Sequence, residues 1–208
     1  MLSAHKNYLS LFLILLSSTC INSEENPYLF IDLNAQQMVS VLTENSDLFN
    51  SDRESYENKI KEIFEPMIDF RRVAASVMGK KYYLLSTKTQ RADFVEIFKD
   101  SLLDTYAETL AQWGDSTIST HFPNDQINIE IKNIEVKQTL NTGSSQYPIS
   151  YKLRKGNNGW KIVNIIINGV NLGLTFRNQF QALAISNNED IESTLNNWVS
   201  DAGDAGIS

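Results

Sequence analysis

The chain has 208 residues, of which 42% are hydrophobic and 10% aromatic, and this is enough apolar surface for one domain with a core. Its formal net charge is -7, and it has no run of Lys or Arg. An acidic chain of this kind is poorly suited to nucleic acid or to an anionic lipid surface, so the composition excludes both as partners for the chain as a whole.

The N-terminus is typical of a secretory signal peptide. Lys6 precedes an apolar run over residues 9–16, and small residues follow at 17–19. The run is far shorter than the ~20 residues that a membrane-spanning helix needs. We therefore predict that residues 1–23 form a signal peptide, removed between about Thr19 and Ser23, and that residues 24–199 form a single domain.

Cys20, the only cysteine, lies where a lipoprotein carries its lipidated residue. Ser17 and Thr19 depart from the residues that lipidation normally requires. Two alternatives therefore stay open: cleavage of the signal peptide without modification, or lipidation of Cys20 that anchors the protein to a membrane. The mass of the mature N-terminus distinguishes them. A single cysteine excludes an intrachain disulfide.

Apolar residues at helical spacing predict four helices in the first half of the chain. Pro66 is expected to end the second and Gly79 the third, and Thr87 to Gln90 form a capping box at the start of the fourth. The helices are expected at 34–42, 53–64, 69–78 and 87–113. Large apolar residues form a stripe along the longest helix, which by itself fits an ordinary core: Phe94, Phe98, Leu102, Tyr106 and Leu110.

From Gln126 the apolar period changes from helical to two, which predicts strands. They are expected at 127–131, 134–136, 147–153 and 160–167, with a bulge or tight turn near Lys132 and an Asn168-Gly169 turn after the last strand. The last strand is apolar at both alternating sets of positions, so it is expected to be covered on both faces.

Two further helices are expected near the C-terminus, one carrying Phe176 and Phe180 and one carrying Leu195 and Trp198. Residues 200–208 are small and acidic, which predicts a flexible tail. Because helices come first and strands second, the predicted fold class is α+β, with N-terminal helices packed on a C-terminal twisted antiparallel sheet.

Residues that support catalysis are scarce. His121 is the only histidine outside the signal peptide, and there is no glycine-rich phosphate loop or paired-cysteine motif, so neither a metal site nor a Ser/His pair is expected. A hydrolase with two carboxylates stays open as an alternative, and carboxylates directed into a cavity would identify it. Arg71 and Arg72 fit surface ion pairs better than a phosphate site.

Two motifs resemble those of a known family. The C-terminal motif has a tryptophan in a strand, then Gly-Val and an aromatic-Arg-x-x-Phe, carried here by Trp160, Gly169, Val170, Leu172, Phe176, Arg177 and Phe180. The central motif is a short helix ending in glycine, then Gln-Arg, spaced phenylalanines and Thr-Tyr-Ala, carried by Asp69, Phe70, Ala74, Gly79, Gln90, Arg91, Phe94, Phe98, Leu102, Leu103, Thr105, Tyr106 and Ala107.

Together these motifs resemble the MlaC family of periplasmic phospholipid-binding carriers. Three positions depart from the family's usual residues: Tyr83 replaces Trp, Asn164 replaces Asp and Asn171 replaces Ser. The resemblance covers residues 36–195. It implies that the helices and the sheet enclose an apolar cavity for acyl chains, whose candidate lining is Phe70, Val73, Val77, Phe94, Phe98, Leu102, Tyr106, Ile162, Ile165, Val170, Leu172, Phe176 and Phe180.

The same resemblance implies a function and partners. The protein would carry phospholipid between the outer and inner membranes and so maintain the lipid asymmetry of the outer membrane. It would need no cofactor or metal beyond the bound phospholipid and would have no enzymatic activity. Its partners would be an inner-membrane ABC transporter with an MCE-domain protein and an outer-membrane lipoprotein complex.

Overall fold

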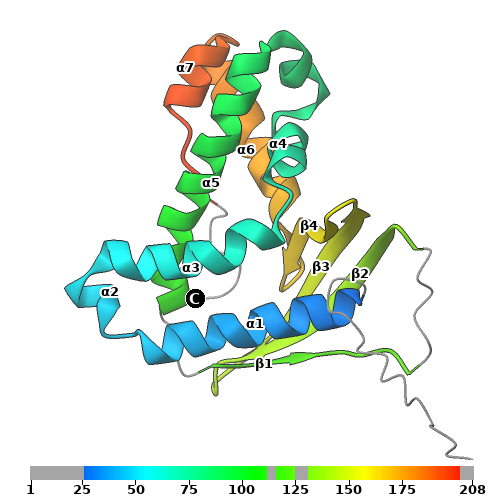
Figure 1. Cartoon of the computed structure of the whole chain (residues 1–208). Coiled ribbons are helices and arrows are strands. Elements are labelled where there is room, and N and C mark those ends of the chain that lie inside the picture. The colour runs from blue at the N-terminus through cyan, green and yellow to red at the C-terminus, as the bar shows by residue number, and fades with distance from the viewer. Residues whose placement is uncertain (1–25, 112–115, 125–130, 202–208) are drawn as a thin grey trace, which may run out of the picture.

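The structure is a computed structural model, which describes residues 26–111, 116–124 and 131–201 (Figure 1). The predicted signal peptide with Cys20, most of the predicted strand at 127–131 and the last seven residues lie outside the described part. Within these ranges, no helix combines the length and the apolar character needed to cross a membrane.

Most of the described helices begin at a side chain that caps free backbone N–H groups. The Asn26 side chain accepts hydrogen bonds from the N–H groups of Tyr28 and Leu29, so the first helix begins earlier than predicted. The Thr87 and Gln90 side chains each accept a bond from the other residue's N–H, which confirms the predicted capping box. The helices are α1 (Pro27–Glu44), α2 (Leu48–Ser51), α3 (Arg53–Met67), α4 (Phe70–Leu85), α5 (Lys88–Ala111), α6 (Leu172–Ser186) and α7 (Ile191–Asn196).

Gly79 separates two helical segments within α4. Its φ of 68° and ψ of 168° are not helical, and a positive φ is a conformation that glycine adopts readily. The first segment therefore stops at Gly79 as predicted, but the second segment, which continues to Leu85, was not predicted. Pro66 was expected to end the preceding helix and lies inside the last turn of α3, which extends one residue further to Met67.

Five antiparallel strands form one sheet in chain order, β1 (Thr117–Thr120), β2 (Asn133–Asn141), β3 (Gln146–Gly156), β4 (Gly159–Ile167) and β5 (Val170–Asn171). The Asn168-Gly169 turn joins β4 to β5 with φ values of 49° and 84°, as a tight two-residue hairpin requires. This sheet and the helices before it confirm the predicted α+β fold class. β1 was missed because Ile118 is its only strongly apolar residue.

A β-bulge in β4 sets which side chains face the helices. Leu153 pairs with Ile162 and Lys152 with Asn164, so Val163 is an extra residue. Beyond it the alternation shifts, and Ile165 and Ile167 lie on the same face as Trp160 and Ile162, the opposite of what strict alternation predicts.

The other face of the sheet is mostly polar, and β4 is only half-buried on that face, so the predicted cover of both faces is incomplete. The neighbouring strands place Glu135, Lys137, Lys152 and Arg154 there, and all four are exposed. The bulge supplies the physical reason, since it gathers most of the apolar side chains of β4 on one face.

Helices cover this apolar face and extend beyond the sheet. Helices α1 and α3 lie across the sheet, whereas α4, α5, α6 and α7 form a bundle at one end of it (Figure 1). Ser200, predicted to begin a flexible tail, is instead fully buried: its carbonyl accepts from Thr105 and its N–H donates to Ser101 on α5. The C-terminal segment is therefore fixed to the bundle as far as this residue.

Candidate functional site

A small apolar cavity lies where the bundle meets the sheet. It measures about 50 Å³, and α4, α5, α6 and β4 all contribute to its walls. We call it the bundle cavity, and its lining consists of Ile68, Val73, Phe98, Leu102, Ile162, Asn164, Ile165, Leu172, Gly173 and Phe176.

A second apolar cavity lies between the sheet and the helices that cross it. It measures about 80 Å³. We call it the sheet cavity, and its lining consists of Ile31, Asn34, Ala35, Met38, Val39, Leu42, Phe64, Met67, Ile118, Leu140, Ile149, Tyr151 and Ile162. Burial raises the pKa of the Tyr151 hydroxyl, so this group stays protonated at neutral pH.

Ile162 lines both cavities, and the junction between α3 and α4 crosses it. Ile68 forms a parallel bridge with Ile162, and the Asp69 N–H donates to the Ile162 carbonyl at 3.0 Å. The two cavities therefore share one side chain of β4, at the point where this short backbone crossing meets the strand.

The structure brings many of the predicted lining residues together around the bundle cavity. These are Val73, Phe98, Leu102, Ile162, Ile165, Leu172 and Phe176. Phe70 is buried at the edge of the bundle, with its ring centroid 6.5 Å from that of Phe98. Val170, in β5, is half-buried and lines neither cavity, and the Tyr106 side chain lies outside the described part.

Three predicted lining residues lie in the core of the bundle instead: Val77, Phe94 and Phe180 are each 0% exposed and line neither cavity. The Phe94 ring centroid lies 4.9 Å from that of Phe180 and 5.5 Å from that of Trp198, with both pairs edge to face. For this part of the stripe, the ordinary-core interpretation agrees with the geometry.

Sequence reasoning missed the sheet cavity. Its lining comes from α1, α3 and four strands, which are far apart in the sequence. The available signals were the helical spacing of Met38 and Leu42 and the alternation of Ile149 and Tyr151. Neither pattern shows on its own that the helix face and the strand face meet.

Two asparagines fix the start of α6 beside the bundle cavity. The Gly173 N–H donates to Asn164 Oδ1 at 3.0 Å, and Asn164 Nδ2 donates to Asn171 Oδ1 at 3.0 Å. Asn171 Oδ1 also accepts from the Leu174 N–H at 3.1 Å, which makes it the N-cap of the helix. The helix that carries Leu172 and Phe176 is thus tied to β4 through Asn164.

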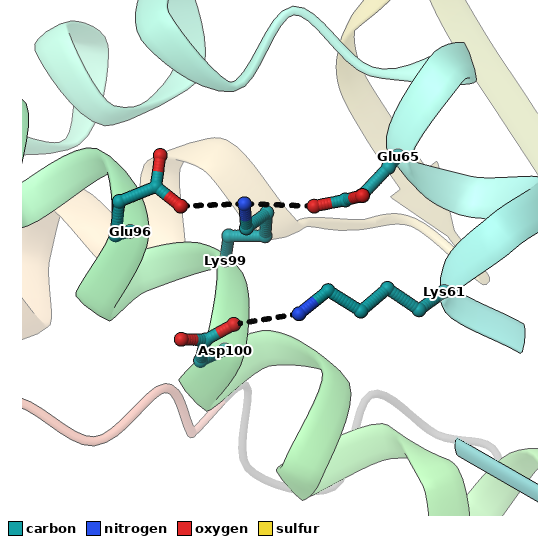
Figure 2. A network of polar contacts seen from close by, with 5 residues as sticks. All are labelled: Lys61, Glu65, Glu96, Lys99 and Asp100. Atoms are coloured by element: carbon teal, nitrogen blue, oxygen red, sulfur yellow. Dashed lines mark hydrogen bonds and ion pairs between the residues drawn. The ribbon is translucent and has the colours of Figure 1, made fainter. Parts of the chain in front are cut away.

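Ion pairs join α3 to α5 on the outside of the bundle. Figure 2 shows Lys99 of α5 between Glu65 of α3, at 2.7 Å, and Glu96 of its own helix, at 2.5 Å. Hydrogen bonds to these two carboxylates raise the pKa of the Lys99 ammonium. A second pair, Lys61 with Asp100 at 3.2 Å, lies nearby and is more exposed.

Side chains suited to metal binding or acid-base catalysis do not gather in either cavity. Among the described residues, no group of three or more His, Cys, Asp or Glu side chains could hold a metal ion. The described linings of both cavities include no carboxylate. The two cavities therefore offer a ligand apolar surface, with the side-chain amides of Asn164 and Asn34 in their linings.

The family of the chain follows from its match to a family model. The model of the MlaC protein matches residues 33–200, which is most of the chain. The chain belongs to the MlaC family.

Two curated relatives are similar along most of their length. The chain is 26% identical to the toluene tolerance protein ttg2D of Pseudomonas putida over 181 residues, which covers 87% of this chain and 83% of that protein. It is 22% identical to the intermembrane phospholipid transport system binding protein MlaC of Haemophilus influenzae over 187 residues, which covers 89% and 78% respectively.

A solved structure has the same fold. The phospholipid-binding protein of Ralstonia solanacearum, determined in complex with a phospholipid, matches with a TM-score of 0.71 and 22% identity. The match covers 80% of this chain and 90% of that one. The MlaC fold described above is therefore shared with a protein whose crystals contained a phospholipid.

Proposed function

We propose that this MlaC-family protein is a periplasmic phospholipid carrier that binds the acyl chains of its ligand without covalent chemistry. The observation that carries the proposal is the bundle cavity. Apart from Asn164 and Gly173, its described lining is wholly apolar, and it includes residues of both family motifs. The relatives named for phospholipid transport and phospholipid binding support the same ligand class.

Energetics indicate what a carrier of this kind must do. Burial of a methylene group is worth ~0.8 kcal/mol, so a chain of about 16 carbons gains on the order of 10 kcal/mol on leaving water. The same chain is already buried in a bilayer, so its net transfer to the protein can be close to neutral. The carrier therefore acts by lowering the barrier to crossing water.

The cavities must widen to admit a chain. Their volumes of about 50 and 80 Å³ are smaller than the roughly 150 Å³ of an engineered cavity that binds benzene. The crossing of Ile68 and Asp69 meets β4 at Ile162, the side chain that the two cavities share. We infer that acyl chains enter by separating this crossing and the start of α6 from the sheet.

The proposed location and partners follow from the family. The predicted signal peptide at residues 1–23 would direct the domain at 24–199 to the periplasm. There it would exchange phospholipid with an outer-membrane lipoprotein complex and with an inner-membrane ABC transporter carrying an MCE-domain protein. We propose that this exchange maintains the lipid asymmetry of the outer membrane.

Extraction of the purified protein tests the proposal. Denaturing extraction followed by mass spectrometry is expected to recover phospholipid from the wild-type protein. Ile165→Glu, which places a charge in the bundle cavity, should lose that lipid, because an unpaired charge is costly to bury. Ile185→Glu is the matched control, since Ile185 is 65% exposed, and it should retain wild-type lipid content. Wild-type protein without lipid in repeated preparations would contradict the proposal.

The two alternatives from the sequence lack a supporting observation in the described part. A hydrolase would need carboxylates directed into a cavity, and the described linings contain none. An anchored module would depend on Cys20, which lies outside the described residues. The mass of the mature N-terminus decides between anchoring and free carriage.

A further inference from the structure

A wide basic groove opens where the α3–α4 junction meets the hairpin between β3 and β4. It encloses about 1140 Å³ and is open to solvent. Asp69 is the only acidic residue in its described lining. The groove collects six basic residues from segments far apart in the sequence: Arg71, Arg72, Lys132, Arg154, Lys155 and Lys161.

Much of this charge has no anionic partner among the residues that the structure describes. Asp69 is already engaged, since it accepts from the Arg72 N–H at 3.0 Å and lies 3.5 Å from Arg72 Nε. Lys161 Nζ donates to the Pro66 carbonyl. Arg71, Lys132 and Arg154 are exposed and form no ion pair with any described acidic residue. In a chain of net charge -7, this is a local concentration of positive charge.

The groove adjoins the bundle cavity. Ile68 lines both of them. Phe70 also lines the groove, and its ring packs toward Phe98, which lines the cavity. A cationic surface and an apolar cavity that share an edge fit a ligand with an anionic group attached to apolar chains.

We propose that the basic groove binds the phosphate group of the phospholipid while the acyl chains occupy the bundle cavity. This assignment rests on the proposed carrier function and adds headgroup recognition to it. Arg71 and Arg154 offer guanidinium groups, which bind phosphate through paired hydrogen bonds. The position of the groove beside the cavity, with Ile68 in both linings, favours a lipid phosphate over an acidic protein surface, which would need no apolar neighbour.

Two soluble ligands with identical tails test the assignment. Dioctanoyl phosphatidylglycerol carries a phosphate, and dioctanoylglycerol lacks it. The lipid-free wild-type protein is expected to bind the phosphate-bearing ligand roughly tenfold more tightly, as a few charge-assisted hydrogen bonds produce. This preference should shrink as NaCl is added, whereas binding of dioctanoylglycerol should not weaken with salt.

Matched variants connect the preference to the groove. Arg71→Gln with Arg154→Gln removes two exposed groove cations, and Lys59→Gln with Lys80→Gln removes two exposed cations that do not line it. The groove variant should lose most of the tenfold preference and bind dioctanoylglycerol as the wild type does. The control variant should keep the preference, which excludes a general effect of net charge.

Each of the following results would overturn one part of the proposal. If the wild type binds neither ligand, the carrier function itself fails. If it binds both equally, carriage stands and the groove assignment fails. If tail-free glycerol phosphate binds as tightly as the phosphate-bearing lipid, the groove is a site for free phosphate. If the groove variant keeps its ligand preference and loses capture of an acidic partner, the groove is a protein-docking surface and the headgroup assignment is wrong.

Discussion

Asn164 Nδ2 donates a hydrogen bond to Asn171 Oδ1 at 3.0 Å, and this contact joins two positions at which the chain departs from the usual MlaC residues. The Gly173 N–H can only donate, so Asn164 must present its oxygen there and its amide NH₂ toward Asn171. Asp and Ser would satisfy the same positions with the donor reversed, because a serine hydroxyl donates to a carboxylate. We therefore expect the two asparagines to compensate for each other.

Asn164→Asp alone should lower the free energy of unfolding by about 1 kcal/mol. The carboxylate keeps the Gly173 bond and gains from the helix N-terminus, but it has no proton to donate to Asn171 Oδ1. Asn171→Ser in the same protein should restore most of the loss. Urea unfolding of both single variants and the double variant gives the coupling energy, and strictly additive effects would contradict the compensation.

Gly173→Ala should cost about 1–3 kcal/mol of stability. A Cβ at Gly173 would lie 2.5 Å from Asn164 Oδ1, so the Asn164 amide would have to move and would lose its hydrogen bonds to the Gly173 N–H and to Asn171. Gly156→Ala is the control, since the nearest atom to its Cβ would be the Gly159 carbonyl oxygen at 4.0 Å. The control should change the unfolding free energy by less than about 0.5 kcal/mol. Equal effects at the two glycines would argue against the close contact.

Val73→Phe should reduce the lipid recovered with the protein, because the larger ring fills the bundle cavity of about 50 Å³. Val39→Phe does the same in the sheet cavity, and comparison of the two shows which space the acyl chains use. Val199→Phe is the control, because Val199 is 68% exposed. Mass spectrometry of extracted lipid measures the effect, and unchanged lipid in both cavity variants would place the chains elsewhere.

Lys99→Met should destabilise the fold by about 1–2 kcal/mol, more than an exposed ion pair contributes. The change leaves Glu65 and Glu96 facing each other without the cation that joins α3 to α5. Lys61→Met, which removes the more exposed pair with Asp100, should cost less than about 0.5 kcal/mol. Thermal or urea unfolding measures both, and equal losses would contradict a special role for Lys99.

The same lysine predicts a pH dependence. Its pKa is raised above the ordinary 10.5 in the folded protein, so the unfolded chain loses this proton first as the pH rises. The contribution of Lys99 to stability is therefore complete below pH 10.5 and declines above it. Between about pH 10.5 and 11.5, wild-type stability should fall more steeply than that of Lys99→Met. If the free energies of unfolding of the two proteins fall in parallel over this pH range, Lys99 is not the source of the pH dependence.

Local patterns predicted the elements of this fold better than their contacts. The capping box at Thr87 and the turn at Asn168 depend on nearby residues alone, and both were found as predicted. The faces of β4 were mispredicted because the bulge at Val163 depends on pairing with β3. Gly79 illustrates the same limit, since a glycine that suits a helix end also suits a kink when the following residues pack against another helix.

For the candidate site too, the sequence indicated the residues better than the contacts that they make. Family motifs indicated Phe98 and Phe176, which the fold places in one cavity wall. They also indicated Phe94, which the fold buries in the bundle core. Both roles produce the same apolar spacing along a helix, and only the position of the neighbouring helices separates them. The sequence assigned Arg71 and Arg72 to surface ion pairs, and it did not show the groove that they line, because the other cations of the groove are scattered along an acidic sequence.

The bulge at Val163 gives β4 one residue more than β3 at this point. Loss of Val163 would leave a regular ladder, because Asn164 would follow Ile162 directly just as Lys152 precedes Leu153. Ile165 and Ile167 would keep the face that they share with Ile162, and Asn164 would keep its place opposite Lys152 and beside the N–H of Gly173. Val163 is thus the residue of β4 whose deletion would least disturb the cavity wall and the start of α6.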